Sequence, residues 1–238
     1  MSRVVVWFSC GAASACAAKL AIQAYGESVS VVYCDLSQDE HPSNLRFRDD
    51  VSEWLGVPVT VIKSSKFDSV EEVWRARSYM AGIRGAPCTG EMKKIPRFAF
   101  QRWDDIHVFG MTAEEGKRIQ RMNDTMPELS FDWLLFDAGL TKNDCFEWLL
   151  RDGLMLPEMY HLGYNNNNCI GCVKATSAGY WTKIRADFPD VFERRVQQSR
   201  SLGVRLARYK GKRLFLDELP AGLLPYRGVS ISCGPDCH

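Results

Sequence analysis

The feature that most constrains the fold is an apolar run that leads directly into a stretch of small residues. Val4–Phe8 is a continuous run of β-branched and aromatic residues, which is typical of a strand buried on both faces. Residues 9–14 are all small, and residues 15–25 are rich in helix formers, with Gly26 as the helix stop. A strand that turns tightly into a helix is the opening unit of a parallel α/β sheet.

The same alternation continues along the chain. Further strands are predicted at residues 29–34, 57–62 and 105–109, and helices at residues 45–55 and 141–151. Strands that alternate with helices imply right-handed crossovers and a mostly parallel sheet flanked by helices, that is, a Rossmann-like α/β core. We place this core at residues 1–155. Residues 156–238 are predicted to form an irregular, cysteine-bearing C-terminal region.

Charge and cysteine content limit the possible functions. The formal net charge is +1, so any affinity for nucleic acid or membrane must be local. Nine cysteines in 238 residues fit a small secreted disulfide scaffold poorly and favour metal or redox chemistry in a reducing compartment. Arg3 and the apolar run after it could also be a signal peptide, but one arginine and the interrupting Gly11 weigh against this. We therefore expect a cytoplasmic protein without a membrane span.

The small residues after the first strand predict a phosphate-binding loop. Ligands of parallel sheets lie at the carboxyl ends of strands, and a helix N-terminus favours negative charge. Gly11 would let backbone N–H groups approach a phosphate, and Ser9 and Ser14 could donate from their hydroxyls. The alternative is a tight turn that needs small residues for packing. Asp35, after the second strand, is a candidate for a ribose hydroxyl, a metal or a helix N-cap.

A second candidate phosphate site follows the fourth predicted strand. Gly110 ends that strand, and Arg118 and Arg121 lie at helical spacing beyond it, so they can share one face. Arginine side chains suit phosphate or sulfate oxygens. A solvated helix surface explains the same residues equally well.

The cysteines predict a metal centre. Cys169 and Cys172 form a Cys-x-x-Cys pair, whose thiolates can converge on one metal or cluster. Cys88 lies in what we interpret as an irregular turn, and Cys233 and Cys237 lie near the chain end. A zinc site with thiolate ligands is the alternative. Buried packing is expected for the remaining cysteines, which are Cys10, Cys16, Cys34 and Cys145.

Read together, these segments resemble PAPS reductases and the related PP-loop adenine-nucleotide hydrolases, which share a HUP-type fold. Residues 8–14 are similar to the family's Ser-Gly-Gly-x-Asp-Ser loop, and residues 33–35 with Glu40 to its Asp-Thr-Gly region. Residues 88–96 resemble Cys-x-x-x-Leu/Met-Lys-x-x-Pro, and residues 110–118 resemble Gly-x-Arg-x-x-Glu-Ser-x-Arg. Residues 168–172 resemble the cysteine pair of cluster-bearing members. The matches occur in order over nearly the whole chain.

The resemblance implies a 4Fe–4S cluster and an adenine nucleotide such as ATP, APS or PAPS. Cys88, Cys169 and Cys172 would ligate the cluster. We expect Cys233 to be the fourth ligand, because the alternating segment before it could pair with the sheet. Without a fourth protein ligand, one iron would be open to substrate or sulfide. Cys237, beside His238 near the chain end, would then be the reactive catalytic thiol. The opposite assignment also has support, because Cys233-Gly234 looks more like the reductase nucleophile motif.

The sequence also departs from the family pattern. Ala13 stands where members that hydrolyse ATP have an aspartate, and Met111-Thr112 replaces the usual arginine region. Thr89 follows Cys88, so the adjacent cysteine pair of sulfonucleotide reductases is missing. These differences put ATP cleavage in doubt more than nucleotide binding.

Three functions remain open. The first is thiol-dependent reduction of a sulfonucleotide, and the second is ATP-dependent sulfur transfer to a nucleobase of tRNA or DNA. The third is a non-catalytic nucleotide or redox sensor. A thiol reductant or sulfur donor is the expected partner, and a homodimer is possible. The second function draws on residues 194–213, which contain no acid but eight cations: Arg194, Arg195, Arg200, Arg205, Arg208, Lys210, Lys212 and Arg213. A solvated helix–strand surface is the alternative interpretation of this stretch.

Overall fold

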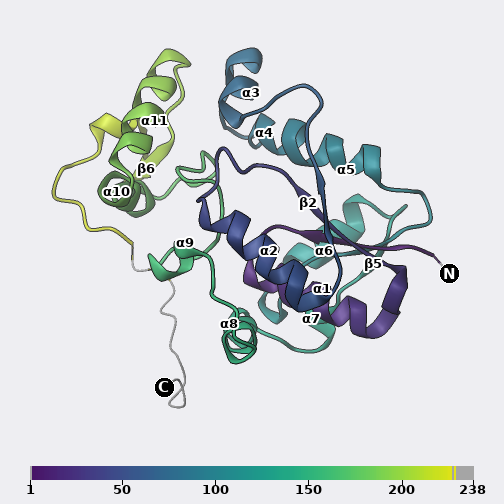
Figure 1. Ribbon diagram of the computed structural model, residues 1–238. Helices are drawn as coiled ribbons and strands as arrows, with labels where there is room; N and C mark the ends of the chain where they lie inside the picture. Colours follow the sequence, from purple (N-terminus) through teal and green to yellow (C-terminus); the bar gives the residue numbers. More distant parts are fainter. Residues whose placement is uncertain (1, 227, 229–238) are drawn as a thin grey trace.

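The computed structural model describes residues 2–226 and residue 228 (Figure 1). Cys233, Cys237 and His238 therefore lie outside the described residues. The centre of the fold is a five-stranded, all-parallel sheet in the order β3-β2-β1-β4-β5. The strands are β1 (Val4–Phe8), β2 (Val29–Cys34), β3 (Val59–Ile62), β4 (Ile106–Val108) and β5 (Ser130–Asp132). The predicted Rossmann-like α/β fold is confirmed.

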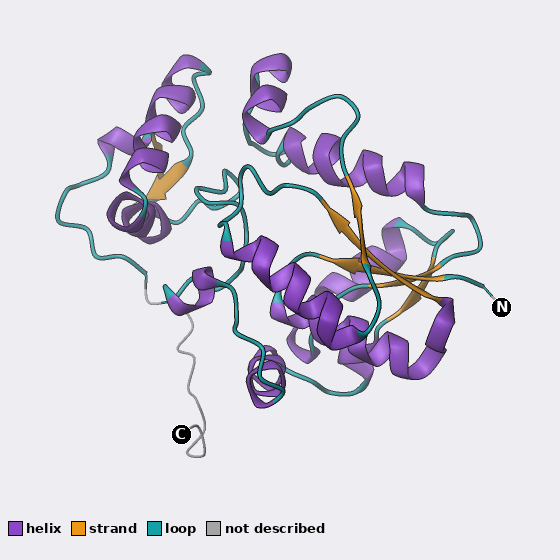
Figure 2. Cartoon of the chain, viewed as in Figure 1, coloured by secondary structure: helices purple, strands orange, loops and turns teal. Residues whose placement is uncertain are grey.

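Helices cover both faces of this sheet (Figure 2). One face packs against α1 (Ala12–Tyr25), α2 (Ser43–Leu55), α7 (Leu134–Asp137) and α8 (Lys142–Arg151). The other face packs against α5 (Ile95–Phe100) and α6 (Gly116–Thr125). In β1, Val4, Val6 and Phe8 enter the first core, whereas Val5 and Trp7 face the opposite side. This two-sided burial is why the strand reads as an uninterrupted apolar run.

The chain after α8 is more regular than the sequence predicted. It contains α9 (Glu158–His161), α10 (Ala178–Asp187), α11 (Pro189–Ser201) and an antiparallel hairpin of β6 (Ala207–Tyr209) and β7 (Lys212–Leu214). These elements share a second core with α3 (Val70–Arg77) and the residues that follow it. In Figure 1, α10, α11 and β6 lie at the upper left, on the side of α3 and away from the sheet. The C-terminal region therefore packs against the chain segment that connects β3 to β4.

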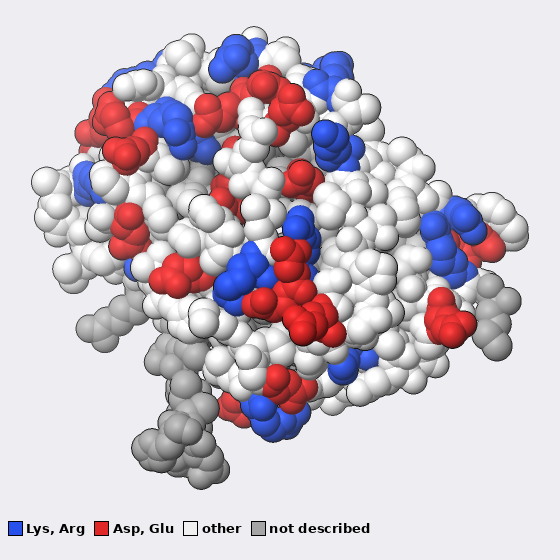
Figure 3. All heavy atoms as spheres, viewed as in Figure 1, with Lys and Arg blue, Asp and Glu red and all other residues white. Residues whose placement is uncertain are grey.

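Short helical turns complete the described structure. The 3-10 turns are η1 (Gly26–Ser28), η3 (Ala113–Glu115) and η4 (Leu216–Glu218). A short helix α4 (Pro87–Thr89) and a π-helical turn η2 (Gly90–Lys94) run directly into α5. No helix in the described part of the chain is long and apolar enough to cross a membrane. Positive and negative side chains are intermingled on the face shown in Figure 3, as the small net charge leads one to expect.

A buried ion pair fixes the start of β4 to the N-terminal strand. The Arg3 guanidinium donates to the Asp105 carboxylate at 2.9 and 2.7 Å, and the Arg102 backbone N–H adds a third bond at 2.7 Å. Burial alone would raise the pKa of Asp105, but these donors outweigh it, so the pKa is lowered.

This pair predicts an acid-dependent loss of stability. A lowered folded-state pKa contributes stability that is complete above the unfolded value of about 4 and is lost as the pH falls through the folded value. We expect Asp105→Asn to lower the unfolding free energy by about 1–3 kcal/mol at pH 7. Urea denaturation at pH 7, 4 and 2.5 measures this. The variant should lose less stability than the parent between pH 4 and pH 2.5, and an equal loss in both would contradict the assignment.

Candidate functional site

The loop after β1 is held by its own serine hydroxyls. The Ser14 hydroxyl accepts from the Ser9 backbone N–H at 3.1 Å and donates to the Gly11 carbonyl at 2.8 Å. The Ser9 hydroxyl lies 3.2 Å from that of Ser14, and Ser9 is exposed. Cys10 has a positive φ of 55°, which is uncommon outside glycine. Ser14 therefore shapes the loop, and Ser9 keeps an accessible hydroxyl for a ligand.

Gly110 brings the end of β4 against this loop. A Cβ atom at Gly110 would lie 2.5 Å from the Ser14 backbone nitrogen and 2.7 Å from the Ala13 carbonyl carbon. Strands β1 and β4 are neighbours at the point where the strand order reverses, and ligands of open α/β sheets bind at such a point. Glycine is therefore required where the two strand ends meet at the candidate nucleotide site.

Two residues from beyond α8 close over the loop. The Tyr160 hydroxyl accepts from the Ala12 N–H at 3.4 Å, and burial raises the pKa of Tyr160 to about 12. The Asn167 amide donates to the Cys10 carbonyl at 2.6 Å and to the Asn44 side chain at 2.8 Å. Neither residue was predicted from the sequence. The polar run at residues 165–168 was the available signal for Asn167.

A buried polar network continues from the loop to the end of β2. The Glu40 carboxylate accepts from the Tyr33 hydroxyl and from the Asn44 amide, both at 2.9 Å. Burial raises the pKa of Glu40. Asp35 has a local role, since its carboxylate accepts from the Ser37 N–H at 2.9 Å and stabilises a turn. A contact of Asp35 with ribose or metal stays a prediction.

The two candidate arginines lie on the solvent-exposed surface of α6. Arg118 forms an ion pair with Glu115 at 2.6 Å, and both Arg118 and Arg121 are exposed. Their positions fit the solvated-surface interpretation, and their contact with phosphate or sulfate stays a prediction.

Cys88 is presented by a helix, which corrects the irregular turn expected from the sequence. Pro87 occupies the first helical position, where its missing N–H costs nothing, and starts α4. The helix continues through η2 into α5, so Cys88 lies in its first turn. Such π-helical turns are frequent at functional sites. This one contains Lys93, whose backbone carbonyl accepts from Cys34 Sγ at 3.8 Å.

The Cys169-x-x-Cys172 turn is held by three different parts of the chain. The Ile170 N–H donates to the Asp39 carbonyl at 2.9 Å, and the Cys172 N–H donates to the Tyr180 hydroxyl at 2.9 Å. Gly171 has φ +66°, and its carbonyl accepts from Arg195 Nε at 3.3 Å. The turn is therefore a fixed structure rather than a loose loop.

Lys93 and the three cysteines influence one another electrostatically. Burial would lower the pKa of Lys93, but the charges of Cys169 and Glu40 outweigh it, so the pKa is raised. Burial raises the pKa of the Cys88 thiol, and the nearby Cys172 adds to this. Burial also raises the pKa of Cys169 well above its ordinary value. Cys88, Ile170 and Val173 pack on the same second core, so the helix that carries Cys88 and the cysteine turn are neighbours. That the three thiols share one metal centre stays a prediction.

The choice between a cluster and a single zinc ion stays a prediction. Within the described part of the chain, no three His, Cys, Asp or Glu side chains are arranged to hold one metal ion. The buried Trp74 indole N–H has no hydrogen-bond partner of normal geometry, yet it lies close enough to Cys88 to oppose the rise in its pKa. A donor at that place suits a ligated thiolate.

The other described cysteines behave as expected. Cys10, Cys16, Cys34 and Cys145 are free and buried. Cys16 Sγ lies 3.6 Å from the Cys145 carbonyl, within the first core.

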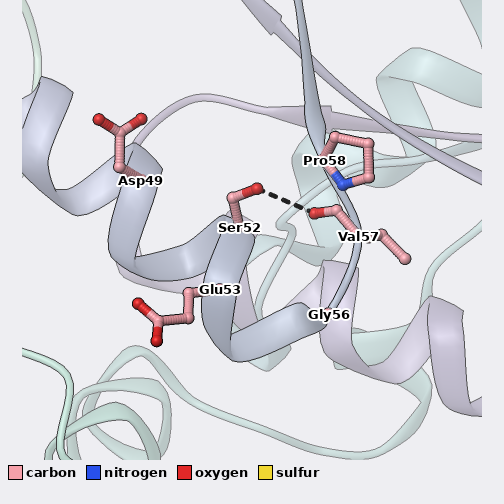
Figure 4. Close-up of a pocket in the computed structure, with 6 residues that line it drawn as sticks. All are labelled: Asp49, Ser52, Glu53, Gly56, Val57 and Pro58. Atoms are coloured by element: carbon pink, nitrogen blue, oxygen red, sulfur yellow. Dashed lines mark hydrogen bonds between the residues drawn. The ribbon is translucent and has the colours of Figure 1, made fainter.

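Two depressions in the described surface lie at different distances from the candidate site. The one in Figure 4 lies at the loop between α2 and β3, lined by Asp49, Ser52, Glu53, Gly56, Val57 and Pro58. It is at the amino end of β3, opposite the edge where ligands are expected. A cavity of about 230 Å³ lies beside the cysteine turn, between Glu40, Ile170 and Arg195.

Arg195 connects the elements around the thiols. It is 2% exposed, pairs with Glu71 at 2.7 Å and lies over the Trp74 ring at 4.7 Å. Together with its bond to the Gly171 carbonyl, these contacts join α11, α3 and the cysteine turn. Its neighbour Arg194 contacts the same Glu71 at 3.1 Å but is about half exposed.

We therefore expect Arg195→Met to loosen the cysteine turn. The variant removes a charged hydrogen bond to the Gly171 carbonyl, so the free energy of unfolding should fall by about 2 kcal/mol. Alkylation of Cys169 and Cys172 should become faster in the folded protein, as followed by mass spectrometry. Arg194→Met is the matched control and should leave both rates unchanged. Equal alkylation rates in the two variants would show that Arg195 does not hold the turn.

Comparison with the models of known protein families gave no match, and comparison with curated proteins gave none either.

Proposed function

We propose that the chain is an iron–sulfur enzyme that binds an adenine nucleotide and reduces a sulfonucleotide by thiol chemistry. The observation that carries this proposal is the contiguity of the two candidate sites. Burial raises the pKa of both Cys10, in the nucleotide loop, and Cys169, in the cysteine turn, and the charge of Glu40 adds to each rise. Asn167, two residues before Cys169, bonds to the loop directly. A nucleotide held by the loop would have its sulfate end near the thiols.

In this proposal the described residues bind the phosphate, balance the charge of the sulfate and hold the cluster. The N–H groups at the start of α1 would bind the phosphate, with Ser9 as an additional donor. The Lys93 ammonium would balance the negative charge of the sulfate group. Cys88, Cys169 and Cys172 would hold the cluster, which when bound would supply iron with an affinity for sulfur.

The reacting thiol in this proposal is Cys237, which lies outside the described residues. Its thiolate would attack the sulfonucleotide sulfur, forming an S–S bond while the bond from sulfur to the phosphate oxygen breaks. The nucleotide phosphate leaves with the electron pair. A thiol carrier would then attack the Cys237 sulfur, forming a disulfide and releasing sulfite.

Product analysis tests this reaction. Anaerobic protein with a dithiol reductant should convert APS or PAPS into sulfite and the matching nucleotide in equal amounts. Cys237→Ser should release no sulfite, whereas Cys145→Ala should retain the activity. Pyrophosphate release from ATP, with no sulfite from either sulfonucleotide, would contradict the proposal.

A second candidate is ATP-dependent thiolation of a nucleobase. The observation that favours it is a group of exposed cations on the β6–β7 hairpin that have no acidic partner among the described residues. A non-catalytic sensor would instead bind nucleotide in a cluster-dependent way without forming any product.

A further inference from the structure

The structure divides the basic stretch of residues 194–213 into two parts. Arg194 and Arg195 pair with Glu71, and Arg200 pairs with Asp217 and Glu218. Five exposed cations form no ion pair with any described residue: Arg205, Arg208, Lys210, Lys212 and Arg213. We call residues 205–213 the basic hairpin. It has no acid within it, in a chain whose overall charge is close to zero.

The strand register places like charges opposite each other. In the pairing of β6 with β7, Arg208 faces Arg213, and Tyr209 faces Lys212. Side chains directly opposite in an antiparallel pair have Cβ atoms about 5 Å apart, and like charges there destabilise the pair. An anion bound between them would remove this cost.

The turn of the basic hairpin adds a second unfavourable feature. Lys210 and Gly211 connect the strands with φ values of 46° and 79°, as in a type I′ turn. Asparagine, aspartate and glycine favour the first position of such a turn, whereas lysine is uncommon there. Lys210 therefore occupies a turn position at which the backbone conformation favours asparagine over lysine.

Backbone hydrogen bonds attach the basic hairpin to the chain segment that follows the cysteine turn. The Arg208 N–H donates to the Thr176 carbonyl at 2.7 Å, and Ser177 pairs with Arg208 as an isolated bridge. The Ala175 N–H in turn donates to the Cys172 carbonyl at 3.0 Å. Figure 1 shows β6 beside α10 and α11, on the same side of the molecule. The basic hairpin is therefore joined to the cysteine turn through residues 175–177.

We propose that the basic hairpin binds the phosphodiester backbone of a single-stranded nucleic acid. Closely spaced cations can follow successive phosphates, and the half-buried Tyr209 ring, with Lys210 Nζ 5.4 Å from its centre, offers a surface on which a base can stack. An acidic protein would satisfy the cations but would not use this ring. The inference deepens the second candidate function and is independent of sulfonucleotide reduction.

Fluorescence anisotropy with labelled 20-nucleotide RNA and DNA of one sequence tests this binding. Each lost phosphate contact should make the slope of log K against log salt less steep by about 0.7. At 0.1 M salt this corresponds to about a fivefold loss of affinity. We expect Lys210→Asn and Lys212→Gln each to weaken binding by about that factor. Lys210→Asn should also leave the melting temperature unchanged or raise it, because asparagine suits the turn. Tyr209→Leu should weaken binding without changing the salt slope.

The control is Arg151→Gln, which removes one exposed cation from α8, far along the chain from the hairpin. Its affinity should match that of the parent. Tighter binding of RNA than of DNA, or the reverse, would identify the source of the phosphodiester. Undetectable binding, equal binding of poly-glutamate, or equal effects of Arg151→Gln and Lys210→Asn would overturn the proposal. Because no sulfonucleotide is present, such a failure leaves the reductase proposal to its own product assay.

Discussion

Gly110→Ala should lower both the stability of the protein and its affinity for adenine nucleotides. The new Cβ would lie within 2.7 Å of backbone atoms of Ala13 and Ser14, which cannot rotate away as a side chain can. Overpacking of this kind costs about 1–3 kcal/mol, and we expect the upper end because backbone atoms must move. Urea denaturation and calorimetry with AMP, APS and ATP measure the two effects.

Gly222→Ala is the matched control for this change. A Cβ at Gly222 meets no atom within 4 Å, and its φ is not positive. It should retain the stability and the affinity of the parent. If Gly110→Ala bound nucleotide as tightly as Gly222→Ala, the β1 and β4 ends would not form the nucleotide site.

The second large effect should follow the loss of any predicted cluster ligand. Anaerobically prepared parent protein should contain about four iron and four sulfide per chain. Cys88→Ser, Cys169→Ser and Cys172→Ser should each lose most of this content and the visible absorption that accompanies it. Lys93→Gln should retain iron but shift the absorption, because it removes the charge beside the thiols.

Cys145→Ala is the control for the cysteine variants, because Cys145 is buried in the first core and away from the turn. It should retain iron and sulfide. Stoichiometric zinc without acid-labile sulfide in the parent would reject the cluster, as would full cluster content in all three ligand variants.

The core of the fold was predictable because its strands are buried on both faces. A strand such as β1 must be apolar at every position, and this leaves a strong signal in the sequence. The edge strand β5 was missed because it has three residues, is only partly buried and includes Ser130 and Asp132. The helix α11 was also missed, although Pro189 at its first turn and the spacing of Phe192 and Val196 were available signals.

The candidate site was predictable only where its residues stand in local motifs. Cys88, Cys169 and Cys172 could be named from their motifs, but the helical setting of Cys88 could not. Contacts across long stretches of sequence leave no local pattern. Tyr160 meets Ala12 across 148 positions of the chain, for example. The role of Arg195 was hidden in the same way, because a buried and a solvated arginine look alike in a basic run.

If a nucleotide binds beside a cysteine-ligated cluster, its binding must change the signal of the cluster, which a titration can follow. Reconstituted protein would be titrated with AMP and APS under anaerobic conditions while the visible absorption and the electron paramagnetic resonance of the reduced cluster are recorded. We predict a saturable change in the cluster signal, with a midpoint equal to the dissociation constant from calorimetry. Nucleotide binding by calorimetry without any change in the cluster signal would contradict the account.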